Sequence, residues 1–260
     1  MASSSMITYA FLGITTLIIM GIYASYCVLG FDAKPLFDEM VEKWKQAKME
    51  NKELEIETTY FDGAMSALFK IVMIFVVVAF SITLLKMNIV GGPPKLDDFT
   101  DIVLASLISV FIAVGLTMAA VRMLPILGRA FENTLGYFGV NTFGGLENIA
   151  ASVFTNTSGS DIKYGVLATK MFDSGFFGFL NKMKTAETSP IKGILLKKEM
   201  LDFGGELNMD SEETNPIFKL FKSIALKHTI SEATWISLAT VLSLFSGFVM
   251  IQYSGIRKKL

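Results

Sequence analysis

Long apolar stretches alternate along the chain with segments that are rich in charge. Residues 7–30 contain no charged side chain, and three further apolar stretches cover about residues 65–90, 101–124 and 233–256. A helix needs roughly 20 apolar residues to cross the hydrocarbon core of a bilayer. The pattern therefore predicts an all-α protein, a polytopic bundle of about four transmembrane helices with amphipathic helices outside the membrane.

Basic residues mark the ends of two of these predicted spans. Lys70 and Lys86 enclose 15 uncharged residues, which at 1.5 Å per residue cover only ~22 Å of a core about 30 Å thick. We expect both lysines to extend their ammonium groups to the membrane interfaces. The last span is followed by three more interfacial cations, Arg257, Lys258 and Lys259.

Helix breakers organise the chain into regions. The sequence Gly-Gly-Pro-Pro at 91–94 predicts a tight turn between the second and third spans. Pro125 is expected to kink or end the third span. The predicted regions are residues 1–124, with three spans and a charged loop at 31–64; residues 125–231, an extramembrane region; and residues 232–260, the fourth span with a basic C-terminus.

The loop at 31–64 carries its own helical pattern. Phe37, Met40, Val41 and Trp44 follow the i, i+3, i+4, i+7 spacing of one helix face. Pro35 suits the first turn of such a helix, and Glu39 lies one turn before Lys43. The pattern predicts a solvated helix with one apolar stripe docked on the bundle or on a partner.

Two more amphipathic helices are predicted between residues 125 and 231. The first covers residues 164–184, and the second begins at Asn215-Pro216. Their apolar faces carry the aromatic side chains Phe172, Phe176, Phe179, Phe218 and Phe221. These faces could lie in the membrane interface, with lysines at the headgroups, or form a small core with each other. The sequence leaves both interpretations open.

The remaining extramembrane residues are less regular. Residues 137–160 are rich in Gly, Asn, Ser and Thr and predict irregular chain. Residues 191–207 fit either a short hairpin or another helix. The pairs Gly144-Gly145 and Gly204-Gly205 predict turns.

Small residues four positions apart indicate where spans pack. They are Gly21 and Ser25, Gly115 and Ala119, and Ala239, Ser243 and Gly247. Such residues let helix backbones approach closely. Packing within the bundle is the favoured interpretation, and an interface between copies in a homo-oligomer is the alternative.

Composition and chemistry restrict the function classes. The chain is 52% hydrophobic and 18% charged, with a net charge of −1, so a basic nucleic-acid surface is not expected. One cysteine and one histidine exclude an intrachain disulfide and multi-histidine metal sites. No phosphate loop, dinucleotide fingerprint or serine elbow occurs. We therefore expect no enzyme activity, no cofactor and no metal.

The stretch from Leu124 to Tyr137, with Arg129 and Glu132 at helical spacing and Gly136 near its end, is unusual. The two charged residues are expected to form a structural ion pair where the chain leaves the bilayer. These 14 residues resemble a segment in membrane proteins of large nucleocytoplasmic DNA viruses. The resemblance implies a virion inner-membrane protein beneath an icosahedral capsid, with minor capsid proteins as partners.

The sequence thus predicts a multi-pass, structural membrane protein that anchors or scaffolds a protein assembly on a bilayer. Its expected partners are lipid and other membrane or capsid proteins. A channel or transporter subunit and a membrane-remodelling protein are the alternatives. Transport is disfavoured because no acidic residue lies in the middle of a predicted span.

Overall fold

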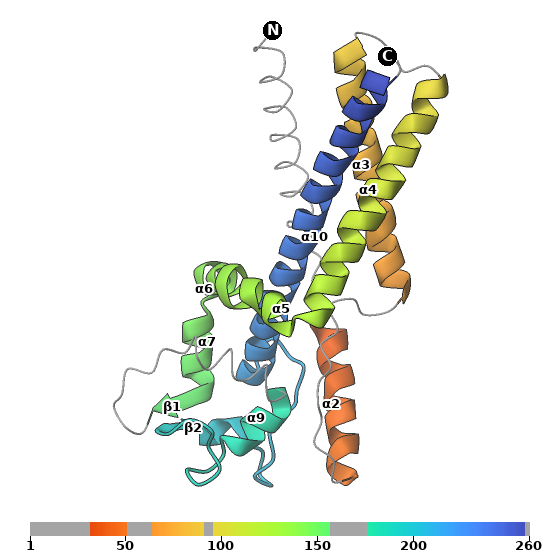
Figure 1. Cartoon of the computed structure of the whole chain (residues 1–260). Coiled ribbons are helices and arrows are strands. Elements are labelled where there is room, and N and C mark those ends of the chain that lie inside the picture. The colour runs from red at the N-terminus through yellow and green to blue at the C-terminus, as the bar shows by residue number, and fades with distance from the viewer. Residues whose placement is uncertain (1–31, 51–63, 91–95, 157–175, 258–260) are drawn as a thin grey trace. The chain divides into compact units, whose positions relative to one another are not determined.

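The computed structural model describes residues 32–50, 64–90, 96–156 and 176–257, and the fold is mostly helical (Figure 1). The elements in chain order are α2 (Lys34–Met49), α3 (Ala64–Val90), α4 (Leu96–Met123), α5 (Pro125–Phe131), a π-helix (Glu132–Gly136), α6 (Tyr137–Gly144), α7 (Leu146–Val153), β1 (Phe154–Asn156), α9 (Phe176–Lys182), β2 (Ile194–Leu196), a 3-10 helix (Lys198–Met200) and α10 (Pro216–Arg257). They form two compact units. Unit 1 takes its described residues from 64–129 and 232–257, and unit 2 from 32–50, 130–156 and 176–231.

Unit 1 contains α3, α4 and the second part of α10. Two helical stretches among the described residues are long and apolar enough to cross a membrane, Phe99–Thr117 in α4 and Pro216–Ile251 in α10. Val72–Leu84 of α3 is a shorter apolar stretch. The predicted first span, with Gly21 and Ser25, and the predicted turn at 91–94 lie outside the described residues.

The helix boundaries in unit 1 follow local chemistry. The third span was expected to end or kink at Pro125, and α4 ends at Met123 while Pro125 begins α5. Proline fits a first helical position because its missing N–H would have no partner there. The interior of the unit is apolar, with Ile74, Val78 and Ile82 of α3 packed against residues of α4 and α10.

Unit 2 is built around an aromatic core. Phe37 of α2 makes edge-to-face contacts with Phe177 of α9 and with Phe218 and Phe221 of α10, at centroid distances of 5.5, 5.1 and 5.1 Å. Such geometry suits the ring quadrupoles. The apolar stripe predicted for α2 is confirmed, because Phe37 and Val41 are buried and Met40 and Trp44 pack against the same core, but the stripe docks on the unit 2 core and not on the bundle or a partner as expected.

The first turn and exposed face of α2 also follow the sequence. Pro35 lies in the first turn of α2, as expected. Glu39 and Lys43 form the predicted ion pair, at 2.6 Å. This pair is exposed, so it contributes little to stability.

The burial of their phenylalanine side chains decides between the two interpretations of the Phe-rich segments, and favours a protein core. Phe176, Phe179, Phe218 and Phe221 are all buried in the unit 2 core. This corrects their assignment to a membrane interface, because side chains that pack against one another have no surface left for lipid. Phe172 lies outside the described residues, and the described part of the predicted 164–184 helix is α9 alone.

The predicted second amphipathic helix and the predicted fourth span are one continuous helix, α10. Its sequence between Lys227 and Ala233 contains neither proline nor glycine. The backbone hydrogen bonds therefore continue through this stretch, and the helix does not break where its sequence changes from amphipathic to apolar.

Two other expectations change. Residues 137–153 are helical rather than irregular, as α6 and α7, and the predicted turn falls at Gly145, whose φ of +61° favours glycine. The all-α expectation misses a small antiparallel sheet in which Phe154 of β1 pairs with Leu196 of β2. Beyond β2, Leu201 and Leu207 form a β-bridge around the second predicted turn, at Gly204-Gly205.

Candidate functional site

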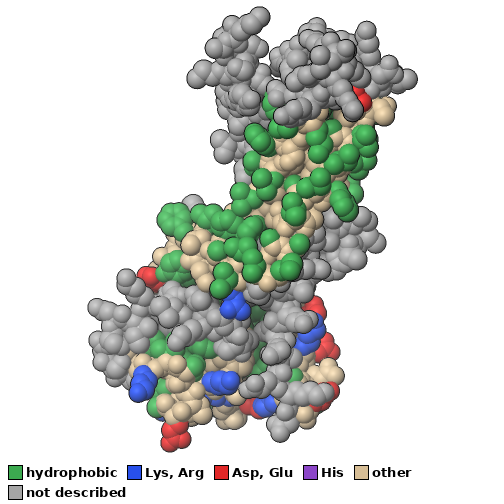
Figure 2. Space-filling view, in the orientation of Figure 1, with side chains coloured by type: hydrophobic (Ala, Val, Ile, Leu, Met, Phe, Trp, Pro, Cys, Tyr) green, Lys and Arg blue, Asp and Glu red, His purple; other side chains and the backbone are tan. Residues whose placement is uncertain are grey.

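The outer surface of unit 1 is apolar. Large hydrophobic side chains of α3, α4 and α10 are exposed there, including Phe80, Phe111, Leu116 and Phe245, and Phe111 is 82% exposed. Figure 2 shows hydrophobic side chains gathered over the face of α4. Soluble monomers rarely expose contiguous apolar patches of this kind, so the surface indicates a partner or a lipid phase.

The interior of the same unit carries small hydroxyl side chains. Ser106 and Ser109 of α4 and Ser243 of α10 are fully buried. Ser106 donates a hydrogen bond to Ile102 O (2.6 Å), and Ser243 donates one to Ala239 O (2.8 Å). Each hydroxyl is thus satisfied by its own helix. Small and hydroxyl residues between helices, with large apolar residues outside, are typical of membrane bundles.

Two of the three predicted small-residue repeats lie in the described residues, and one of them packs against a neighbouring helix. Ala239, Ser243 and Gly247 are buried. A Cβ atom built on Gly247 would lie 2.5 Å from Ile82 Cδ1 and 3.2 Å from Ser109 Oγ. Gly115 and Ala119 are exposed instead, and a Cβ on Gly115 would meet no atom of the described residues within 4 Å. Their expected role in packing within the bundle stays a prediction, because the predicted first span lies outside the described residues.

Enlarging Gly247 should destabilise unit 1. Gly247→Leu would force apart the helix junction with Ile82 and Ser109, at an expected cost of about 1–3 kcal/mol for overpacking. Gly115→Leu is the matched control, because no atom of the described residues lies within 4 Å of a Cβ at that position. Thermal unfolding of the two variants in the same detergent measures the difference. Equal effects would show that α10 does not pack at Gly247 in the way described.

Unit 2 contains a buried ionic cluster. Glu132 in the π-helix is 3% exposed and Lys227 in α10 is 1% exposed. Glu132 Oε1 lies 3.4 Å from Lys227 Nζ, and Glu132 Oε2 lies 3.8 Å from His228 Nδ1. Lys227 Nζ also donates a hydrogen bond to Asn133 Oδ1 (3.1 Å). The buried charges are therefore compensated locally, as burial requires.

Gly136 permits the π-helix to approach α10 closely at this cluster. A Cβ atom on Gly136 would lie 2.5 Å from the backbone oxygen of Lys227. Because the obstructing atom belongs to the backbone, any side chain at position 136 would push the π-helix away from α10. Gly136 thus brings Glu132 within reach of Lys227.

The electrostatics of Glu132 combine opposing influences. Burial is the largest of them and acts to raise the pKa of the carboxyl group. The interactions with the neighbouring His228 and Lys227 side chains together outweigh burial, so the pKa of Glu132 lies below its ordinary value of 4.5. Its carboxylate is therefore charged at neutral pH, and protonation breaks the cluster.

The lowered pKa of Glu132 gives unit 2 an acid dependence. Stability from this group is fully present above the unfolded pKa, near 4.5, and is lost as the pH falls through the lower folded pKa. In the Glu132→Gln variant this contribution disappears. Hydrogen exchange of α9 amides, followed between pH 6 and 3, should show a smaller loss of protection in the variant. Parallel curves for the two proteins would contradict the assignment.

The other predicted charged residues are less informative. Glu132 contacts Lys227 and His228, and Arg129 is exposed, so the expected pairing of Arg129 with Glu132 stays a prediction. The side chains of Lys70, Lys86 and Arg257 lie outside the described ones, as do residues Lys258 and Lys259. The sequence offered no signal for Lys227, which is one of several lysines in its region.

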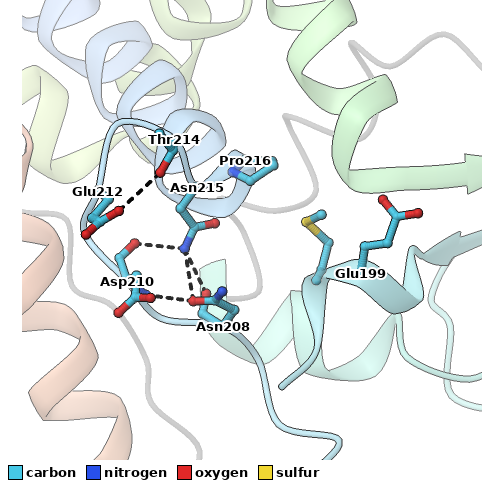
Figure 3. A pocket seen from close by; sticks show the side chains of 8 residues that line it. Glu199, Asn208, Asp210, Glu212, Thr214, Asn215 and Pro216 are labelled. Carbon is cyan, nitrogen blue, oxygen red and sulfur yellow. Dashed lines mark hydrogen bonds between the residues drawn. The ribbon is translucent and has the colours of Figure 1, made fainter. Parts of the chain in front are cut away.

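A small polar pocket of about 200 Å³ lies where α10 begins (Figure 3). Asn215 Oδ1 accepts a hydrogen bond from Ile217 N (2.9 Å), which caps the helix. Asn215 Nδ2 donates to Asn208 O (3.1 Å) and Asp210 O (2.8 Å). The side-chain oxygen and nitrogen of Asn215 are thus both hydrogen-bonded within the protein. Glu199 and Glu212 also line the pocket. Its polar wall at Asn215 is accounted for by the cap of α10.

A metal-binding cluster is not found in the part of the chain that the structure describes. No group of three or more His, Cys, Asp or Glu side chains there is placed to hold a metal ion. The site that stands out is instead the apolar surface of unit 1. No protein-family model, curated protein or solved structure matches the chain.

Proposed function

We propose that the chain is a structural membrane protein whose helical unit 1 is anchored in a bilayer and whose unit 2 binds a protein partner outside it. The observation that carries this proposal is the distribution of side chains in unit 1. Phe80, Phe111 and Phe245 are exposed, whereas Ser106 and Ser243 are buried. Lipid is the solvent in which this arrangement is favourable.

Unit 2 supplies the surface for a partner. It has its own core, and Figure 2 shows Lys, Arg, Asp and Glu side chains on the surface of this unit. The turn at 201–207 is tied to α2 by an ion pair between Lys48 and Glu206 (2.5 Å), and Lys184 Nζ donates a hydrogen bond to Gly205 O (3.0 Å). A folded, charged module joined to a membrane anchor suits a scaffold.

The viral resemblance would make this proposal more specific. In that case the bilayer would be the inner membrane of a virion, and the partner of unit 2 would be a minor capsid protein. The segment that carries the resemblance includes Glu132 and Gly136, which form the contact with Lys227.

The alternative functions have less support. A channel needs polar groups directed into a pathway, but Ser106 and Ser243 donate to their own helices, and no charged side chain is buried among the described residues of unit 1. The remodelling hypothesis relied on the Phe-rich segments as a wedge in one leaflet, but Phe176, Phe179, Phe218 and Phe221 fill the core of unit 2. Neither alternative is proposed.

Crosslinking in native membranes tests the scaffold. A photoreactive benzoyl-phenylalanine is placed at Lys198, an exposed position of unit 2, or at Phe111 of unit 1. After an alkaline carbonate wash the full chain should stay with the membrane. The probe at 198 should then yield one protein adduct in stoichiometric amounts, and the probe at 111 should yield lipid adducts. Release of the chain by carbonate, or no protein adduct at 198, would contradict the proposal.

A further inference from the structure

We propose that the helical segment that follows α4 lies in the interface of the bilayer, with Leu135 and Phe138 among the lipid chains and Arg129 at the headgroups. This inference rests on the proposed membrane location of α4. It differs from the interfacial helices expected from the sequence, because those aromatic faces are buried in the unit 2 core.

Chain continuity brings the segment to the membrane surface. α4 ends at Met123, Pro125 begins α5, and helical structure continues through the π-helix to Gly144. Phe138 is 15 residues beyond Met123, which in a helix is at most ~22 Å of chain. When α4 spans the bilayer, this segment begins at the point where the chain emerges.

The segment has two distinct faces. Glu132, Gly136 and Val140 are spaced by four residues and are buried in unit 2. Leu135 and Phe138, three residues apart, are 48% and 66% exposed. Residues three or four apart share a helix face. The protein covers one face of the helix, and the other face presents large apolar side chains with no cover from the described residues.

The charges of the segment fit a lipid surface. Residues 124–144 contain two charged side chains, Arg129 and Glu132. Glu132 is turned inward beside Lys227, whereas Arg129 is exposed. The exposed side chains of the segment thus include one cation, the polar Asn133 and Thr134 and the apolar pair Leu135 and Phe138, but no acidic group that an anionic bilayer would repel. An in-plane helix with an apolar face and basic residues at the headgroups has this composition.

Depth-dependent quenching of a fluorophore tests the placement. The full chain, with its single Cys27 replaced by serine, receives one cysteine at Phe138 for an NBD label. It is reconstituted into vesicles of three parts phosphatidylcholine and one part phosphatidylglycerol. Phe111→Cys in unit 1 and Asn181→Cys, at an exposed position of α9, are the references. Lipids with a nitroxide at carbon 5 or at carbon 12 of the acyl chain act as shallow and deep quenchers.

The expected pattern separates the inference from the function on which it rests. The label at 138 should be quenched several-fold more by the shallow than by the deep nitroxide, the label at 111 most by the deep one, and the label at 181 by neither. Quenching at 111 without quenching at 138 overturns the interfacial helix and leaves the membrane anchor standing. A label at 138 that neither lipid nor an aqueous iodide quencher reaches would show a protein cover, which also overturns it. No quenching at 111 contradicts the proposed function itself. Leu135→Cys repeats the measurement independently of Phe138.

Discussion

Replacing Lys227 with methionine should lower the free energy of unfolding of unit 2 by about 3–5 kcal/mol, the cost of breaking a buried ion pair. Lys227 is 1% exposed, and its ammonium group lies 3.4 Å from Glu132 Oε1. Methionine keeps the unbranched shape of the side chain, one atom shorter, but removes the positive charge. The carboxylate of Glu132 then stays buried with less compensation, which is the main source of the loss.

A double-mutant cycle separates the ion pair from ordinary packing. Glu132→Leu combined with Lys227→Met removes both charges, and apolar replacement of a whole buried pair is often nearly neutral. The double variant should therefore recover most of the stability that Lys227→Met loses. Exchange of α9 and α10 amides in the full chain reports the unfolding of unit 2. Additive losses in the double variant would show that Glu132 and Lys227 are not energetically coupled.

Truncating Phe37 should have an effect of similar size. Phe37 is fully buried and contacts the rings of Phe177, Phe218 and Phe221. Phe37→Ala leaves a cavity between α2, α9 and α10, and such a truncation costs about 3–5 kcal/mol. Because α2 precedes the rest of unit 2 by a long stretch of chain, we expect α2 to lose its protection from exchange first.

The neighbouring Leu36 provides the matched control. It occupies the adjacent position of α2 but is 37% exposed. Leu36→Ala changes helix propensity in the favourable direction and truncates a side chain that is partly in solvent rather than in the core, so its effect should be well below that of Phe37→Ala. A loss in Leu36→Ala comparable to that in Phe37→Ala would contradict the docking of α2 through its Phe37 face.

The elements that the sequence predicted well have strong local signals. The second predicted span, 65–90, corresponds to α3 at 64–90, because a long apolar run favours one helix. Pro35 and Pro125 mark helix starts through their fixed backbone geometry. The apolar stripe of α2 follows from helical periodicity alone.

The contacts that the sequence did not reveal join distant positions. Lys227 and Asn133 are 94 residues apart, and the π-helix that turns Glu132 inward has no visible sequence pattern. Spacing alone also failed to show which small residues pack. Gly115 and Gly247 each belong to a four-residue repeat, but in the described part of the chain only Gly247 meets a neighbouring helix. The deciding factor is which face of a helix meets another, and this is set by the tertiary fold.

The amphipathic segments show the same limit. Phe176 and Phe218 lie on apolar faces that suit either lipid or protein, and periodicity does not distinguish the two. Their burial depends on α2, which supplies Phe37 to the same core from a different part of the chain. The apolar faces of α9 and the first part of α10 are thus covered by α2, which lies more than 100 residues earlier in the chain.

The collision rates of a nitroxide at position 111 test most directly whether lipid surrounds unit 1. The label is attached to Phe111→Cys in the Cys27→Ser background, in the full chain reconstituted into vesicles. Apolar oxygen concentrates in the bilayer, whereas a nickel chelate stays in water. Because the side chain of Phe111 projects from the outer face of α4, we predict frequent collisions with oxygen and few with the chelate. Frequent collisions with the chelate would place this surface in water and contradict the account.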